Sequence, residues 1–210
     1  MKIARKAAAL AAASLLLVPG STLVASERLE RALDLTESMV LEEPKVEEEV
    51  AVEEPDTPKR WQCLGCTDVE NQVLKALQEK GITDKIALAV VMGNIKQESK
   101  FILNICEGGV RTGYERCYRG GFGLIQWTTT GRYTGLGATA RQHGLDPNTL
   151  DAQPKWMFNE REWREVEYRF KTPGQSMSYY MNAAYRWLGW GVHGARTHYS
   201  NQYMHYFHWV

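Results

Sequence analysis

The feature that most constrains this 210-residue chain is the apolar run Ile-Ala-Leu-Ala-Val-Val-Met at residues 86–92. Thr83 is placed to cap a helix there, with Asp84 in the first turn, where a negative charge suits the helix dipole. A helix that is apolar around its circumference must be covered on most of its surface. We therefore expect this helix at the centre of a single core.

Glu98 stands at the C-terminal end of that helix, on the face that also carries Asn94 and Ala87. Burial and the negative end of the helix dipole both raise the pKa of a carboxyl group. A carboxyl group that stays protonated near neutral pH suits a general acid in glycoside cleavage. The alternative is a surface glutamate at a frayed helix end, paired with Lys96 or Lys100.

A glycine-rich turn, Gly-Gly-Phe-Gly-Leu-Ile-Gln-Trp, follows at residues 120–127. Glycines at positions 120, 121 and 123 allow positive φ angles or a close approach to a polymer. Trp127 is suited to stacking on a sugar, and Gln126 to holding a water molecule or an acetamido group. The alternative for Trp127 is a place in the hydrophobic core.

The chain contains two motifs, Met-Gly-Asn-x-x-x-Glu-Ser-x-Phe at residues 92–101 and Gly-Phe-Gly-Leu-Ile-Gln-Trp-Thr at residues 121–128. Together they resemble the phage tail lysozyme family. The Glu-Ser pair followed by Gly-Leu-x-Gln is also similar to soluble lytic transglycosylases and goose-type lysozymes. The resemblance spans about residues 69–207 and continues more weakly through Leu150, Gln153, Trp156 and Glu160. It implies an α+β, mainly α, lysozyme-like domain with a small β and loop insert after the catalytic helix.

The activity that the resemblance implies is that of a muramidase, which cleaves the β-1,4 bond between N-acetylmuramic acid and N-acetylglucosamine in bacterial peptidoglycan. Glu98 would be its general acid, and no cofactor or metal would be needed. The implied substrate-binding residues are Ser99, Gly121, Gly123, Gln126, Trp127 and Thr128. A lytic transglycosylase acting on the same bond and a catalytically silent wall-binding module remain as alternatives.

The second catalytic group is not fixed by either motif. Glu107 and Glu115 both lie in the predicted insert, and either carboxylate could act as a base over the cleft. Otherwise they are solvated loop charges, and Glu98 serves as acid and then base, or Thr128 or Thr129 positions the water. We predict hydrolysis, with Glu107 as the second catalytic residue.

The four cysteines, Cys63, Cys66, Cys106 and Cys117, are an even number, which indicates disulfides in an exported protein. Three connectivities are possible. We favour Cys63–Cys66 with Cys106–Cys117, since the second bond would close the glycine-rich loop between the two motifs. A thioredoxin-like redox function for the first pair lacks the βαβ pattern that usually surrounds such a motif.

The start of the chain has the features of a secretory signal over residues 1–25. Lys2, Arg5 and Lys6 precede an apolar run at residues 7–18, and small residues precede a cleavage site after Ala25. The run is short for a membrane span, although residues 7–25 together could form a releasable anchor. We expect export to the periplasm or the extracellular space, with membrane contact only transient and only through this signal.

Residues 26–60 have the composition of an acidic, disordered linker, and residues 61–210 that of the catalytic domain. From residue 27 to 60, twelve Asp and Glu stand against five Lys and Arg, a net charge of −7. From residue 61 onward, seventeen basic residues stand against thirteen acidic ones, a net charge of +4. Mild basicity suits an anionic wall polymer, no stretch indicates nucleic-acid binding, and we expect a monomer. An export signal is typical of a phage lysis enzyme (an endolysin) or of a bacterial wall-remodelling protein.

The remaining pattern predicts helices. A capping box at residues 67–70 begins a helix that ends at Gly81. Further helices are expected from residue 130 to 143, within residues 150–170 with Pro154 in the first turn, and over residues 178–188 and 195–208. Six glycines in residues 102–127 exclude a helix there and favour short extended pieces.

Overall fold

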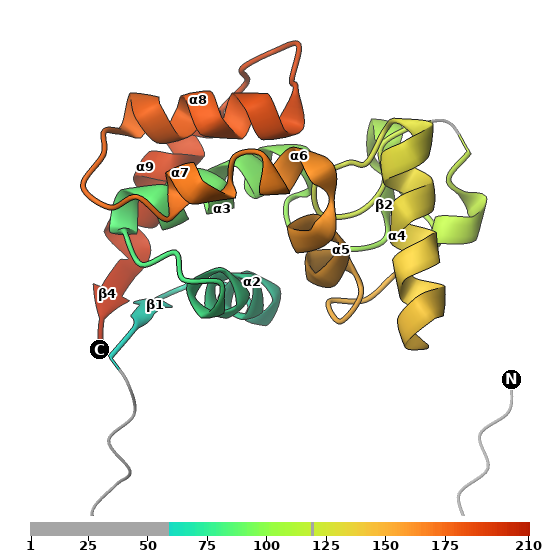
Figure 1. The fold of residues 1–210 in the computed structure, drawn as a ribbon, viewed down its shortest axis with the longest axis horizontal. Helices are drawn as coiled ribbons and strands as arrows, with labels where there is room; N and C mark the ends of the chain where they lie inside the picture. The colour runs from blue at the N-terminus through green and yellow to red at the C-terminus, as the bar shows by residue number, and fades with distance from the viewer. Residues whose placement is uncertain (1–58, 119) are drawn as a thin grey trace, which may run out of the picture. The chain divides into compact units, whose positions relative to one another are not determined.

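The computed structural model describes residues 59–118 and 120–210, which form a mainly helical domain with two small antiparallel sheets (Figure 1). The predicted α+β, mainly α class is therefore confirmed. The predicted signal and nearly all of the predicted linker lie outside the described residues. No helix in residues 59–118 and 120–210 is long and apolar enough to cross a membrane.

Helix α3 (Lys85–Ser99) forms the centre of the domain, and nine of its consecutive residues, 87–95, are buried. Its neighbours are α9 (Arg196–Tyr206), α8 (Met177–Leu188) and α2 (Asp68–Glu79). The helix begins one residue later than predicted, because Asp84 and not Thr83 is the cap. The Asp84 carboxylate accepts hydrogen bonds from the amides of Ile86 and Ala87, at 2.8 and 3.0 Å.

The close packing of α3 on α9 depends on Gly93. A Cβ atom at this position would lie 2.4 Å from the Ser200 hydroxyl oxygen and 2.5 Å from the Ser200 backbone nitrogen. No side chain fits into that space, so a glycine in the middle of α3 allows the two helix backbones to approach. Its cost to helix propensity is offset by this contact.

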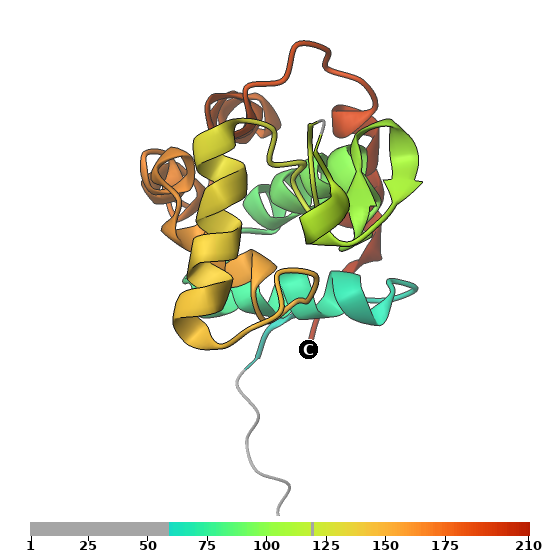
Figure 2. The ribbon, with the colours of Figure 1, turned by 90° about the vertical axis from the view of Figure 1, so that its right-hand side faces the viewer.

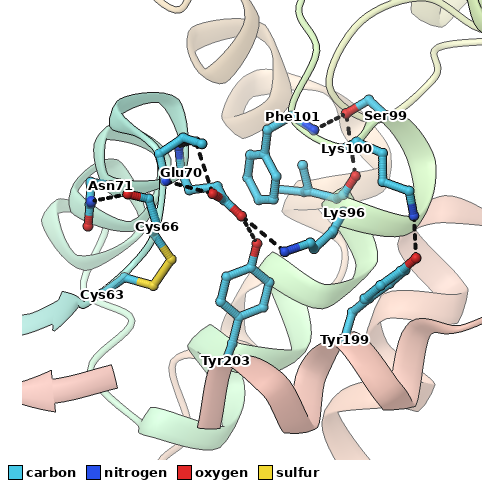
Figure 3. A network of polar contacts seen from close by, with 12 residues as sticks. Cys63, Cys66, Glu70, Asn71, Lys96, Ser99, Lys100, Phe101, Tyr199 and Tyr203 are labelled. Carbon is cyan, nitrogen blue, oxygen red and sulfur yellow. Dashed lines mark hydrogen bonds and ion pairs between the residues drawn. A yellow bond between two sulfur atoms is a disulfide. The ribbon is translucent and has the colours of Figure 1, made fainter. Parts of the chain in front are cut away.

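Helix α2 begins at the predicted capping box, in which Thr67 and Glu70 exchange side-chain and backbone hydrogen bonds. Glu70 is 7% exposed, and its carboxylate also accepts hydrogen bonds from Tyr203 of α9 and from Lys96 of α3 (Figure 3). One buried carboxylate thus joins α2, α3 and α9. The predicted end at Gly81 agrees with the last helical residue, Glu79.

The predicted β and loop insert lies between α3 and α4 (Thr130–His143). It contains the hairpin of β2 (Ile105–Cys106) and β3 (Val110–Arg111) and the short helices η1 (Glu107–Gly109) and η2 (Tyr114–Arg116). Figure 2 looks onto the side of the domain that carries α4 and the insert. The two are joined where the Tyr114 hydroxyl donates to the Tyr133 carbonyl oxygen at 2.9 Å.

Both predicted disulfides are present. Cys63 is bonded to Cys66, and Cys106 is bonded to Cys117. The second bond joins β2 to the segment after η2, so it clamps the insert as expected.

The single helix predicted within residues 150–170 is wrong in part, because three short helices occupy the segment. They are α5 (Gln153–Asn159), α6 (Arg161–Arg164) and α7 (Glu167–Phe170). The first break falls at Glu160, which has extended backbone angles and a fully buried carboxylate bonded to other elements. Pro154 lies in the first turn of α5 as predicted.

The last predicted helix is also too long, since α9 ends at Tyr206. Residues Phe207–Trp209 form strand β4, which pairs antiparallel with β1 (Trp61–Cys63). Trp61 stands opposite Trp209, with ring centroids 5.1 Å apart in an edge-to-face arrangement. His208 therefore belongs to a strand, and the two ends of the domain lie side by side.

Candidate active site

Glu98 is the second-last residue of α3, and 17% of its side chain is exposed. Burial raises the pKa of Glu98, while the positive charges of Arg196 and Arg132 act in the opposite direction. The net pKa lies above the ordinary value of a glutamate, in the direction expected from the sequence. The carboxyl group is thus sheltered but still reachable from solvent.

Arg196, the first residue of α9, is the ion-pair partner of Glu98. It is 4% exposed, and desolvation lowers its own pKa. One terminal guanidinium nitrogen donates to the Glu98 carboxyl group, and the second terminal nitrogen donates to the carbonyl oxygens of Val192 and His193 at 3.0 and 2.9 Å. The guanidinium carbon lies 4.4 Å from the centre of the Trp190 ring.

The alternative partners considered from the sequence are engaged elsewhere, so pairing of Glu98 with Lys96 or Lys100 is wrong. Lys96 donates to Glu70, and Lys100 donates to the Tyr199 hydroxyl (Figure 3). The Lys96 side chain points away from Glu98 toward α2, and the Lys100 side chain points toward α9. The true partner of Glu98 is 98 residues distant in the chain and carries no motif of its own.

Gln97 fastens the same end of α3 to the loop between α8 and α9. Its side-chain oxygen accepts a hydrogen bond from the Ala195 amide at 2.9 Å. Gly194 has a φ of +60°, and a Cβ there would lie 2.9 Å from the Gln97 amide group. Two successive residues of α3, Gln97 and Glu98, therefore hold this loop in place.

The glycine-rich turn is held from within the protein. Gln126 has a φ of +54°, and its amide nitrogen donates to the carbonyl oxygens of Ile105 and Gly123 at 3.3 and 3.0 Å. Gly123 has a φ of +70°, and the next amide donates to the buried side chain of Gln153 at 2.9 Å. Gly121 and Gly123 are buried, and a Cβ atom would lie 2.7 Å from the Gln126 side chain at the first position and 2.6 Å from that of Gln153 at the second. These glycines allow the turn to pack closely and are not placed to contact substrate as predicted.

Trp127 is fully buried, so the predicted stacking of its ring on a sugar is wrong. Its indole nitrogen donates to Glu160 at 3.0 Å. The same carboxylate accepts from Trp187 at 2.8 Å and from two nitrogens of Arg132 at 2.8 and 2.7 Å. Buried polar groups need hydrogen-bond partners. By accepting these hydrogen bonds, Glu160 joins Trp127, Arg132 of α4 and Trp187 of α8. This centre was missed from the sequence.

Ser99 is also placed inside the protein, at 1% exposure. Its hydroxyl donates to the Ile95 carbonyl oxygen at 3.4 Å and accepts from the Phe101 amide at 3.1 Å. Phe101 and Lys100 both have positive φ angles. The predicted substrate-binding role of Ser99 is therefore replaced by a structural one, which is to end α3 directly after Glu98.

Three predicted residues are exposed in and after the insert: Thr128, Glu107 and Glu115. The Glu107 amide donates to the Gly121 carbonyl oxygen at 2.8 Å, and its carboxylate lies against Gly120, where a Cβ would be 1.6 Å away. Glu107 is thus fixed to the glycine-rich turn. Within the described residues, no hydrogen bond or ion pair joins Glu107 or Glu115 to Glu98, and the second catalytic group stays a prediction.

A partly sheltered carboxyl group with a raised pKa, at the end of a buried central helix, is the kind of group that general acid catalysis uses. The phage tail lysozyme family matches residues 68–203, and the chain belongs to this family. Its membership confirms the family expected from the two motifs and indicates an enzyme that degrades the bacterial cell wall. Neither the comparison with curated proteins nor the comparison with solved structures finds a match.

Proposed function

We propose that the chain is a muramidase and that Glu98 protonates the glycosidic oxygen between N-acetylmuramic acid and N-acetylglucosamine. The observation that carries this proposal is the position of Glu98, which is mostly buried and has a pKa above the ordinary value. A protonated carboxyl group that is still reachable from solvent is what the first step requires.

Arg196 and Arg132 also stabilise the carboxylate that Glu98 becomes after it has donated its proton. Once Glu98 has donated its proton, the carboxylate that remains is stabilised by the guanidinium of Arg196, which is already in hydrogen-bond contact. Arg132 adds a more distant positive charge while its own side chain is held by Glu160. The two arginines therefore favour the product of proton transfer without removing the raised pKa.

Glu107 is proposed as the second carboxylate, acting on a water molecule so that the outcome is hydrolysis. Its support is the Cys106–Cys117 bond beside it and the two contacts that hold it against residues 120 and 121. These features hold the backbone of Glu107 beside the glycine-rich turn, and its exposed carboxylate is free to reach a water molecule. Glu115 lies on η2 and lacks the contact with the turn.

The substrate is proposed to be peptidoglycan reached after export, and the two disulfides support an oxidising compartment. The test is the Glu98→Gln variant on purified peptidoglycan, with the released fragments identified by mass. The substitution preserves shape and should reduce lysis by at least about a hundredfold, the usual scale for general acid catalysis. Near-normal lysis by a folded variant would remove Glu98 from the mechanism.

A further inference from the structure

A pocket of about 460 Å³ lies between α8 and the segment that leads into α9. This volume is within the range of pockets that bind small molecules. Helix α8 contributes Met177, Met181, Asn182 and Tyr185 to its lining, and the following loop contributes Trp190 and His193. None of these residues belongs to the two sequence motifs.

The lining combines flat aromatic surfaces with hydrogen-bonding groups. Tyr185 is 51% exposed, and its ring meets that of Trp190 edge to face with centroids 5.3 Å apart. Met177 adds apolar, adaptable surface, and Met181, which is only 9% exposed, adds a smaller part. An N-acetylated hexosamine has matching parts, since its ring has an apolar C–H face, its rim carries hydroxyls, and its acetamido group joins a methyl to an amide.

The polar groups of the pocket are held in position by neighbours. The Asn182 side-chain oxygen accepts from Arg169 and Arg186 at 3.1 and 3.2 Å. Within residues 59–118 and 120–210 the Asn182 amide nitrogen has no hydrogen-bond acceptor, so it is available as a donor. The His193 ring nitrogen Nε2 is 2.8 Å from the Thr197 hydroxyl, which fixes the imidazole. An available amide donor and an imidazole held by a neighbour are suited to hydrogen bonding with the hydroxyls of a sugar.

Trp190 connects this pocket to the catalytic acid. Its ring lines the pocket and also lies against the Arg196 guanidinium, which donates a hydrogen bond to Glu98. The Arg196 side chain therefore lies between Trp190, in the wall of the pocket, and Glu98, the proposed proton donor. We propose that the pocket binds an N-acetylhexosamine unit of the glycan strand, next to the bond that Glu98 cleaves. This inference rests on the proposed function, and a peptide stem of the wall is the competing occupant.

The test measures binding in the full chain carrying Glu98→Gln, so that the ligand is not cleaved. A soluble trimer of N-acetylglucosamine is titrated by calorimetry against this parent and three further variants. Tyr185→Ala should weaken binding by about five- to tenfold, the scale of one aromatic contact. Ser178→Arg, which fills the pocket from an exposed position on its rim, should abolish binding. Tyr206→Ala removes an exposed tyrosine at the end of α9, outside the pocket lining, and should bind like the parent.

Unchanged binding in both Tyr185→Ala and Ser178→Arg would overturn the assignment of the pocket. The assignment would also be overturned if the sugar trimer fails to bind to the parent while a free stem peptide binds to the parent and not to Ser178→Arg. In the active enzyme, Tyr185→Ala should raise KM for glycan strands more than it lowers kcat. Lysis by Glu98→Gln would instead reject the proposed catalytic role and leave the binding result to stand independently.

Discussion

Arg196 donates a hydrogen bond to Glu98 across 98 residues of sequence, at the point where α9 begins and α3 ends. The arginine is more buried than the acid that it contacts, with 5% and 17% of the two side chains exposed. Burial and the arginine charge act on the carboxyl group in opposite directions. The protonation state of the proposed catalytic acid is therefore set by a balance that a single substitution can shift.

Replacement of Arg196 by glutamine should move the pH profile of wall lysis. Removing the positive charge disfavours the carboxylate, so the pKa of Glu98 rises further. Activity falls at high pH because the acid loses its proton, and this limb should move upward by about one pH unit or more. Arg196→Lys, which keeps the charge, is the matched control and should move the limb less. A limb that stays in place or moves downward in a folded glutamine variant would show that the pair does not control the acid.

The two insert carboxylates should differ in importance. Glu107→Gln is expected to reduce lysis by at least about a hundredfold, since it removes the proposed base, whereas Glu115→Gln should stay near wild type. The wild-type products should carry reducing-end muramic acid. Release of 1,6-anhydromuramyl fragments by the wild-type enzyme would contradict hydrolysis while leaving Glu98 as the acid.

The two disulfides should contribute unequally to stability and to lysis. Loop-closure entropy gives about 3 kcal/mol for the Cys106–Cys117 bond and about 2 kcal/mol for the shorter Cys63–Cys66 loop. The double alanine variants of each pair should show this order in urea unfolding without reductant. Loss of the first bond should also reduce lysis more strongly, because Glu107 follows Cys106 directly. Thiol titration of the unfolded wild type should find no free cysteine, and two or more reactive thiols would refute the assignment.

The hydrogen bond from Tyr203 to Glu70 should make the free energy of unfolding depend on pH. Burial raises the pKa of Glu70, but hydrogen bonds from Tyr203 and Thr67 and the charge of Lys96 outweigh it, so the net pKa is lowered. A depressed carboxyl pKa stabilises the fold above the unfolded value, near 4.3, and this stabilisation is lost as pH falls through the folded value.

Tyr203→Phe removes one donor to this carboxylate and keeps the ring. The free energy of unfolding should fall by about 1–3 kcal/mol at pH 7, and the difference from wild type should shrink below about pH 4. Urea unfolding at both pH values provides the measurement, with Tyr206→Phe, an exposed neighbour on α9, as the control. A destabilisation that is equal at both pH values would mean that only packing is lost.

Local patterns in the sequence were sufficient to predict much of the fold. The apolar run at residues 86–92 predicted α3, and residues 67–70 predicted the start of α2. Cysteine spacing and the glycine-rich loop led to the correct disulfides. Each of these features depends on residues that are close together in the chain, so short-range physical rules apply to them.

The surroundings of Glu98 could not be predicted in the same way. Arg196 lies in a stretch without a motif, and its role depends on how α9 crosses α3 at Gly93. The burial of Trp127 is likewise decided by Glu160, 33 residues further on. A tryptophan beside a glycine-rich turn looks the same in sequence whether its ring faces solvent or a buried carboxylate. Tertiary contacts alone separate the two cases.

The pairing of β1 with β4 brings the first and last segments of the described domain together. Arg60 and Val210 exchange two backbone hydrogen bonds, at 2.8 and 3.0 Å, so its first and last described segments meet at one point. A few added residues would suffice to join them, and the chain could then be opened at an exposed turn such as the one at Gly144, which follows α4. Such a circularly permuted domain would keep α3, α9 and the Glu98–Arg196 pair while presenting its ends on a different side.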